Sequence, residues 1–294
     1  ELIAKSQGSP ASLIIVNSKK RAKQIYRDCT GRKFHLSTYL TATDRKRIID
    51  TIKEELHALE TDYPDLACVP EERRITVVST SLIEAGVDLD MCTVFRELTG
   101  LDSILQSGGR CNREGKRDDG STYIFSFSDS RKVSSDERAN LTRGLLRKYD
   151  NITSPECIRE YYDRLFFMNS DHIEHYAMSN FCRGIDSIPF KTYAQGFRII
   201  EDSTESIAVP SDENSRQLVD KLRYIGQNPD QAGGIGSISR KLQKYTCSVS
   251  REELRSLIEQ GAVQDFDTGI WCLMNSDYYD KDEGIGFEPK DYII

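Results

Sequence analysis

Residues 74–80 of the chain read RITVVST, and this stretch decides the fold that we expect. Its β-branched residues are those that strands favour. Short apolar or β-branched runs recur along the first half of the chain, at residues 12–17, 35–38, 92–98 and 121–127. Helical patterns lie between most of these runs, and strands that alternate with helices favour a mainly parallel sheet with helices on both faces. We therefore predict an α/β fold for residues 1–128.

Two helices are expected between the first strands. The first follows residue 17, and the second has Thr43 as its N-cap. Each has one apolar face, formed by Ala22, Ile25, Tyr26 and Cys29 in the first helix and by Ile49, Ile52, Leu56 and Leu59 in the second. These faces are expected to cover the sheet.

The second half of the chain has a different pattern. Residues 129–189 are predicted to form a helical linker, in which Ser154 caps a helix that begins at Pro155. Residues 190–294 are predicted to form a small α+β domain. Within it, Ser250 and Glu253 have the spacing of a capping box, and Gly261 is expected to end that helix. Residues 269–274 are predicted to form a strand and residues 278–287 a hairpin.

Composition excludes several classes of protein. The 294 residues carry a net charge of −7, which argues against a broad basic face for duplex DNA but allows a local basic channel. None of the eight cysteines forms a C-x-x-C pair, so we expect neither a zinc site nor a disulfide framework. Scattered cysteines and the lack of a long apolar stretch suit a cytoplasmic protein without a membrane segment.

Residues 106–113 read QSGGRCNR and carry the first chemical signal. If Asp102 caps a helix, Gln106, Arg110 and Arg113 share one helical face with Gly109. Guanidinium groups form bidentate bonds to phosphate oxygens and stay charged, so this face suits a polyphosphate. An alternative stays open, in which the face is a solvated basic surface paired with Glu97 or Glu114.

Residues 79–90 read STSLIEAGVDLD and carry the second signal. Thr80 and Ser81 end a predicted strand, where small hydroxyl groups can bond a phosphodiester backbone without reading bases. Gly86 allows close approach of a ligand to the backbone, and Asp88 can accept a bond from a ribose hydroxyl. Taken alone, Gly86 could equally end a turn and Asp88 could cap the next element.

No G-x-x-x-x-G-K-[ST] phosphate loop occurs in the sequence. A chain with a phosphate-binding arginine segment but no phosphate loop is typical of one lobe of a two-lobe machine. We therefore expect the main ATP pocket to lie on another lobe.

Residues 79–90 and 106–113 resemble motifs V and VI of superfamily-two helicases. More narrowly, they resemble the CRISPR-associated helicase-nuclease of type I systems. Residues 12–26 are similar to motif IV of that family, and residues 35–38 (HLST) to a short segment that contacts the DNA backbone. Residues 190–202 and 240–249 resemble its C-terminal domain more weakly. The resemblance implies a second RecA-like lobe, linker helices and a small C-terminal domain.

The resemblance also implies roles. In that family the enzyme unwinds DNA 3′ to 5′ with ATP and Mg, and a histidine-aspartate nuclease domain degrades the strand. The catalytic roles in ATP hydrolysis fall on Gln106, Arg110 and Arg113, and the ATP-binding roles on Gly86 and Asp88. The roles in binding the single-stranded DNA backbone fall on Asn17, Ser18, Ser37, Thr80 and Ser81.

The implied partners are single-stranded DNA, the first helicase lobe and nuclease domain of the same parent protein, and the CRISPR surveillance complex. ATP and Mg are expected to bind mainly to that first lobe, so the chain alone is expected to be inactive. Asp171, His172 and His175 are in the wrong order for the nuclease and are expected on a helix surface. Two alternatives stay open: another superfamily-two DNA or RNA motor, and a non-enzymatic binding module.

Overall fold

The computed structural model describes residues 1–84, 87–118, 120–127, 136–178, 204–228 and 234–289, with the side chains of residues 169–178 left out. These residues pack into two compact units. The first contains Glu1–Arg96, Ser107–Tyr123 and Ser203–Ile294, and the second contains Glu97–Gln106 and Ile124–Asp202. The predicted domain boundaries at residues 128 and 189 lie outside the described residues.

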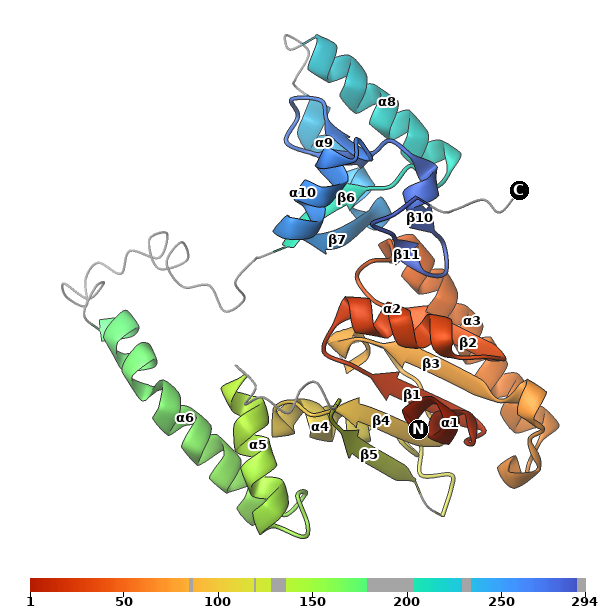
Figure 1. Cartoon of the computed structure of the whole chain (residues 1–294), viewed down its shortest axis with the longest axis vertical. Coiled ribbons are helices and arrows are strands. Elements are labelled where there is room, and N and C mark those ends of the chain that lie inside the picture. Colours follow the sequence, from red (N-terminus) through yellow and green to blue (C-terminus); the bar gives the residue numbers. More distant parts are fainter. Residues whose placement is uncertain (85–86, 119, 128–135, 179–203, 229–233, 290–294) are drawn as a thin grey trace. The chain divides into compact units, whose positions relative to one another are not determined.

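A five-stranded sheet forms the centre of the first half of the chain (Figure 1). Its strands are β1 (Ala11–Ile15), β2 (Arg32–Leu36), β3 (Ile75–Ser79), β4 (Thr93–Glu97) and β5 (Ser121–Phe125), in the order β2-β3-β1-β4-β5. The pairs β1–β3, β1–β4 and β2–β3 are parallel. This confirms the predicted α/β fold with a mainly parallel sheet. The second strand begins three residues before the predicted stretch.

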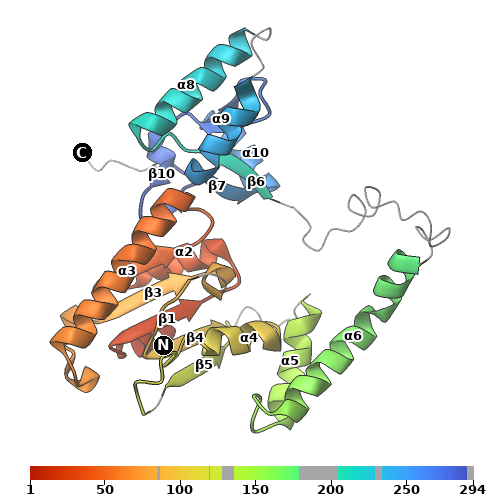
Figure 2. The same cartoon turned by 180° about the vertical axis from the view of Figure 1, so that it is seen from behind.

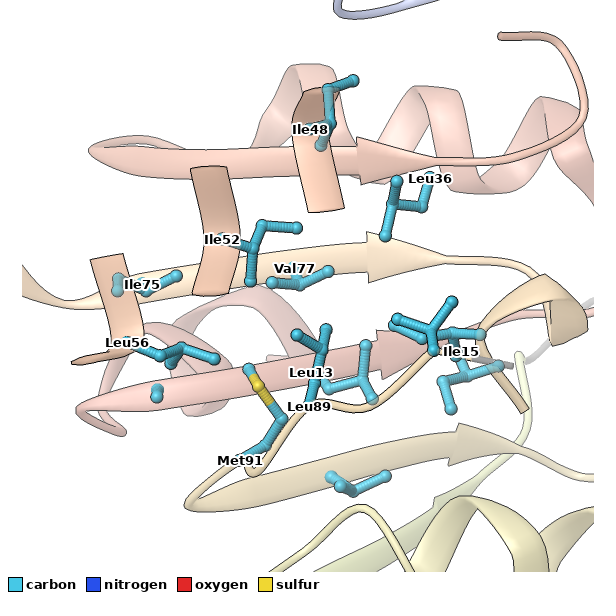
Figure 3. Close-up of a cluster of buried hydrophobic side chains, with 14 of the residues drawn as sticks. Leu13, Ile15, Leu36, Ile48, Ile52, Leu56, Ile75, Val77, Leu89 and Met91 are labelled. Carbon is cyan, nitrogen blue, oxygen red and sulfur yellow. The ribbon is translucent and has the colours of Figure 1, made fainter. Parts of the chain in front are cut away.

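Apolar side chains from α3 (Ala42–Asp62) and the sheet form the main core (Figure 3). Thr41, rather than the predicted Thr43, caps α3, and its side chain accepts a bond from the amide of Asp44. The helix therefore starts two residues earlier than expected. Its buried apolar stripe begins at Ile48, and Ile49 is only partly buried. On β1, Leu13 and Ile15 belong to this core.

The opposite face of the sheet is covered as well. Strand alternation directs Ile14 and Val78 away from Leu13 and Val77, and both are fully buried. Helix α2 (Lys19–Asp28) packs against β3 and buries the apolar side chains of Ala22 and Ile25. A short helix, α1 (Leu2–Gln7), precedes β1. The central strands β1 and β3 are therefore buried on both faces, as their apolar sequences require, whereas β5 at the edge is exposed or partly buried.

The second unit is mainly helical. Helices α5 (Glu137–Lys148) and α6 (Pro155–Met178) pack together around the buried side chains of Leu101, Leu145, Cys157 and Tyr161. The predicted cap at Ser154 is confirmed, since its hydroxyl accepts a bond from the amide of Cys157 at 3.2 Å. Residues 171, 172 and 175 lie on α6, but their side chains are outside the described set.

Asp102 is not the cap that the sequence predicts. It lies inside the first turn of α4 (Leu101–Gly108), and its carboxylate accepts a hydrogen bond from the Tyr161 hydroxyl at 2.7 Å. A Cβ on the neighbouring Gly100 would lie 2.7 Å from the same hydroxyl oxygen. The carboxylate of Asp102 is therefore used in a contact with α6 rather than as a helix cap.

The C-terminal elements form a four-stranded sheet with three helices. Strands β6 (Thr204–Ala208), β7 (Thr246–Ser250), β8 (Val263–Asp265) and β9 (Trp271–Leu273) lie in the order β7-β6-β9-β8. The helices are α8 (Glu213–Gln227), α9 (Ile235–Leu242) and α10 (Arg251–Glu259). The capping box of Ser250 and Glu253 begins α10, and Gly261, at φ +65°, follows its end, as predicted. Figure 2 shows these elements from behind.

A hairpin of β10 (Tyr279–Asp280) and β11 (Gly284–Ile285) lies directly on the first half of the chain. The amide of Ile285 donates to the carbonyl of Tyr39 at 3.0 Å. Gly284, at φ +77°, comes so close that a Cβ there would lie 2.5 Å from the carbonyl carbon of Tyr39. The Tyr279 hydroxyl accepts a bond from the amide of Thr41 and donates to the carboxylate of Asp44. The predicted hairpin therefore also attaches the C-terminal elements to the five-stranded sheet and its helices.

Within the described residues, no helix combines the length and apolar composition needed to cross a membrane. The same residues contain no group of three or more histidine, cysteine, aspartate or glutamate side chains placed to hold a metal ion.

His35 is buried in β2, with its ring centroid 5.7 Å from that of Tyr26. Burial and the positive charge of Lys23 lower the pKa of His35 to about 4, and the negative charge of Glu283 opposes this shift. The imidazole is therefore neutral in the folded protein at pH values where an exposed histidine carries a proton.

We predict that the free energy of unfolding falls as the pH drops from about 6.5 to about 4. Only the unfolded chain protonates His35 in this window, and the loss amounts to roughly 3 kcal/mol. Urea unfolding at pH 7.5 and 4.5 measures this loss. The His35→Phe variant should lose this part of the pH dependence, whereas substitution of the exposed His57 should retain it. Equal pH dependence in both variants would contradict the prediction.

Candidate functional site

The parallel register brings the predicted DNA-contacting residues to one edge of the sheet. Ser79 at the end of β3 pairs with Ile15 on one side and with Leu36 on the other. The segments that follow these three strands therefore leave the sheet at the same edge. They carry all five predicted DNA-backbone residues, Asn17, Ser18, Ser37, Thr80 and Ser81.

These five side chains differ in exposure. Asn17, Ser18 and Ser81 are exposed, whereas Thr80 is 8% exposed and Ser37 is fully buried. The Ser37 hydroxyl accepts a bond from the Tyr39 amide at 3.2 Å, so it shapes the turn after β2. Ser18 caps α2 by accepting a bond from the amide of Arg21. Three of the five therefore present polar groups to solvent in this structure.

The predicted helix through residues 106–113 is wrong in its second half. Helix α4 ends at Gly108, and Arg110 and Arg113 lie beyond it. The reason is a backbone bridge, in which the Met91 amide donates to the carbonyl of Arg110 and the Asn112 amide donates to the carbonyl of Met91. Adjacent glycines weaken the helix where the chain enters this bridge. The exposed Gln106 therefore does not share a helical face with the two arginines.

Arg113 and Asp88, to which the sequence assigns separate roles, lie side by side in the structure. The Arg113 Nε is 2.6 Å from the Asp88 Oδ1, and both side chains are exposed, at 43% and 71%. The Arg113 amide donates to Asp90 at 2.8 Å, which holds the backbone of this turn. Asp88 thus takes the place of Glu97 and Glu114, the carboxylates expected to pair with the arginines. Gly86 lies outside the described residues.

Arg110 is buried, in contrast to Arg113. Its Nη2 donates to the backbone carbonyl of Glu84 at 2.7 Å, and its Nε has no hydrogen-bond partner among the described residues. Burial and the nearby positive charge of Arg113 lower the pKa of the Arg110 guanidinium. Arg110 and Arg113 thus place two positive charges near each other, and Arg110 has an unused N–H donor. This arrangement would stabilise a bound anion.

Sequence analysis missed a buried ionic network next to these groups. Arg96, at the end of β4, and Glu84 form an ion pair of 2.9 Å, and their side chains are only 2% and 8% exposed. The Arg96 Nη1 also donates to the Asn17 Oδ1 at 2.6 Å. The Ser107 hydroxyl donates to the carboxylate of Glu84 at 3.2 Å. A sequence signal existed, because Arg96 and Glu97 interrupt an otherwise apolar strand.

The network joins three separate segments of the chain. Asn17 belongs to the segment after β1, Glu84 to the turn after β3, and Ser107 to the end of α4. Glu84 also holds Arg110 through its backbone carbonyl. Buried, charge-assisted hydrogen bonds therefore connect Asn17, at the exposed ends of the strands, to the segment that carries Arg110.

We predict that Arg96→Met lowers the free energy of unfolding by about 3–5 kcal/mol, because it leaves the carboxylate of Glu84 buried without a counter-ion. Urea unfolding measures this loss. The double variant Arg96→Met with Glu84→Gln should be more stable than the single variant. As a control, Arg73→Met breaks an exposed pair with Asp62 and should cost at most about 1 kcal/mol. A similar small loss for Arg96→Met would contradict the buried network.

Comparison with known proteins identifies this region. Residues 9–116 match the family model described as the C-terminal part of the CRISPR-associated nuclease/helicase Cas3. Residues 9–116 are therefore similar to the C-terminal helicase region of Cas3. The match contains all of the candidate site, from Asn17 to Arg113.

Curated Cas3 relatives support this assignment. The CRISPR-associated nuclease/helicase Cas3 of Methanothermobacter thermautotrophicus is 31% identical over 145 residues, which cover 47% of this chain and 16% of that protein. The Cas3 of Haloferax volcanii is 49% identical over 55 residues, which cover 18% of this chain and 6% of that protein. The matched stretches thus span less than a fifth of either relative.

Solved structures confirm the fold. The T. fusca Cas3-ADP structure superposes with a TM-score of 0.58 at 12% identity, covering 97% of this chain and 40% of that chain. The T. fusca Cas3-ATP structure gives a TM-score of 0.56 at 14% identity, covering 92% and 37%. The predicted fold class therefore agrees with the C-terminal part of a Cas3 helicase.

Proposed function

We propose that this chain is the second motor lobe and C-terminal domain of an ATP-dependent translocase of single-stranded DNA that acts in CRISPR type I interference. One observation carries the proposal within the Cas3 region. The network of Arg96 and Glu84 joins the exposed polar edge at Asn17 to the segment that holds Arg110. A motor needs such a connection, because a change at the nucleotide must move the strand.

The strand side of the proposal uses the edge of the sheet. The side chains of Asn17, Ser18 and Ser81 are exposed at the ends of parallel strands, where ligands of such sheets gather. Amide and hydroxyl groups bond phosphate oxygens without reading the bases. This chemistry suits a translocase that must pass over any sequence.

The nucleotide side uses the two arginines and Asp88. Arg113 pairs with Asp88 in an exposed ion pair, which costs little to separate because water screens it. When an ATP bound on a first lobe approaches, Arg113 turns to its γ-phosphate and Asp88 is released to accept a ribose hydroxyl. Arg110, held at Glu84, supplies a second charge from a fixed position. Gln106 and Gly86 complete the proposed set.

ATP and its Mg are proposed to bind mainly to the first lobe. The similar structures include T. fusca Cas3-ATP, Cas3-ADP and Cas3-AMPPNP, which suits a nucleotide-driven cycle. The chemistry supplied by this chain is electrostatic, since positive charge placed at the transferring phosphoryl group lowers the barrier. Such arginines are worth about 10³–10⁵ in rate in the studied GTPases.

The proposed partners follow from the family. They are single-stranded DNA, the first helicase lobe and nuclease domain of the same parent protein, and a CRISPR surveillance complex. Without the first lobe, the chain lacks a phosphate loop, and we expect the purified chain to have no ATPase activity. Sustained ATP turnover by the chain alone would contradict the proposal.

We predict that Arg113→Ala in the intact enzyme lowers DNA-stimulated ATPase activity by about 10³-fold, because the transition state loses a fixed positive charge. The fold should be retained, since Arg113 is exposed and its ion pair contributes little. Steady-state phosphate release measures the effect. Arg113→Lys should not restore the rate, because a lysine cannot form bidentate bonds.

A matched control is Arg73→Ala, which removes another exposed arginine that pairs with an aspartate. It should leave the ATPase rate unchanged. A normal rate in Arg113→Ala would remove the basis of the proposed catalytic role.

A further inference from the structure

A groove runs along helix α8, away from the site described above. One part has a volume of about 500 Å³ and is lined by Lys221 of α8, Arg240 and Lys241 of α9, and Lys244 of the turn Gln243–Tyr245. A second hollow of about 550 Å³ continues from it, since both share Gln217 and Lys221. Figures 1 and 2 both show α8 and α9 side by side. We call this surface, from Asn214 to Tyr224 along α8, the α8–α9 groove.

Positive charge predominates in the α8–α9 groove, although Asp220 lines the second hollow and Asp212 lies within electrostatic reach of Lys244. Lys221, Arg240, Lys241 and Lys244 are all exposed, and none forms an ion pair with any residue that the structure describes. The two arginines on α8 behave differently, because Arg216 pairs with Glu213 and Arg223 with Asp220. Cations that lie together without an ion-pair partner repel one another, even in a chain of net charge −7, and an anionic ligand would relieve that repulsion.

The walls of the groove are held in place by a packed core. Val219 and Leu222 of α8 are buried against Leu242 and Tyr245. The backbone carbonyl of Lys244 also accepts a bond from the Thr43 hydroxyl at 2.9 Å. The backbone that carries the four cations is therefore preorganised, which lowers the entropic cost of binding a ligand.

The other polar groups point to the class of ligand. Asn214 and Gln217 line the same surface, and such amides bond phosphate oxygens alongside lysine and arginine. Tyr224 is 53% exposed at the edge of the second hollow, three residues after Lys221 on the same helix. An exposed aromatic ring beside a cationic track is the combination that binds unpaired bases and their backbone.

We propose that the α8–α9 groove binds the phosphodiester backbone of a single-stranded nucleic acid, with one base stacked on Tyr224. This inference deepens the proposed function and rests on it, by adding a contact on the C-terminal elements to the one at the sheet edge. From Asn214 to Tyr224 the helix rises about 15 Å.

The test uses the chain itself and a fluorescein-labelled oligothymidylate of twelve nucleotides. A groove variant replaces Lys221, Arg240, Lys241 and Lys244 by glutamine, and fluorescence anisotropy gives the dissociation constant at several salt concentrations. Binding should weaken by at least about tenfold at low salt. The slope of log K against log salt should fall in magnitude by up to about 2.8, or 0.7 for each lost phosphate contact.

A control variant removes the same charge elsewhere, by replacing the exposed residues Lys46, Lys53, Arg159 and Arg255 with glutamine. None of these forms an ion pair among the residues that the structure describes. It should bind the oligothymidylate far better than the groove variant does. Equal loss in the two variants would overturn the proposal, because it would show that only net charge matters.

Tyr224 separates a nucleic acid from an acidic polypeptide. Tyr224→Ala should weaken binding about fivefold or more, and Tyr224→Phe should not, because stacking needs the ring and not the hydroxyl. Polyglutamate of equal charge should compete poorly with the oligothymidylate. If polyglutamate competes equally well and Tyr224→Ala binds normally, the groove is a site for an acidic polypeptide and the proposal fails.

The intact enzyme distinguishes this inference from the proposed function. The groove variant should raise the DNA concentration that gives half-maximal ATPase activity by severalfold, with little change in the maximal rate. A groove variant with unaltered DNA dependence, in an enzyme that Arg113→Ala inactivates, would overturn the groove alone. A normal rate in Arg113→Ala would instead contradict the motor, whatever the groove variant does.

Discussion

The guanidinium group of Arg96 is buried near the end of strand β4. Burial of its charge would be costly without the carboxylate of Glu84. The two groups are 2.9 Å apart, and Arg96 also bonds Asn17. Because an unpaired charge in this position costs several kcal/mol, the three segments that meet here cannot separate independently. The sheet edge and the arginine segment therefore respond as one body. The proposed motor function would require this property, because a change at the nucleotide would have to move the strand.

The C-terminal elements are attached to the five-stranded sheet and its helices by close backbone packing, hydrogen bonds and ion pairs. The hairpin carries Gly284 against the backbone of Tyr39, where no side chain would fit, and Tyr279 bonds the cap of α3. Arg27 and Arg47 add ion pairs to Glu283 and Asp282. Shape and buried hydrogen bonds thus hold the α8–α9 groove on the same unit as the exposed polar edge. Two surfaces for one extended ligand can then lie on a single body.

Local sequence patterns predicted the elements whose determinants are themselves local. The capping box of Ser250 and Glu253 and the cap at Ser154 occur as predicted, because each depends on residues within one helical turn. The end of α4 at Gly108 was not predicted. The helical pattern of residues 106–113 contains no information about the β-bridge between Met91 and Cys111, which the chain forms after α4 ends. The start of α4 was also missed, since the partner of Asp102 is Tyr161 on a distant helix.

The sequence by itself determined the α/β class, the order of the strands in the first half of the chain, and the motif residues that resemble the helicase family. Periodicity and short motifs are properties of neighbouring residues. Only the tertiary structure decided which of those residues are exposed and which are buried. Ser37 and Arg110 are buried, whereas Arg113 pairs with Asp88 in solvent. The roles of Arg96 and Glu84 and the convergence of four cations beside α8 also emerged only in three dimensions. Each depends on segments that are far apart in the chain and that folding alone brings within the range of a hydrogen bond or a charge.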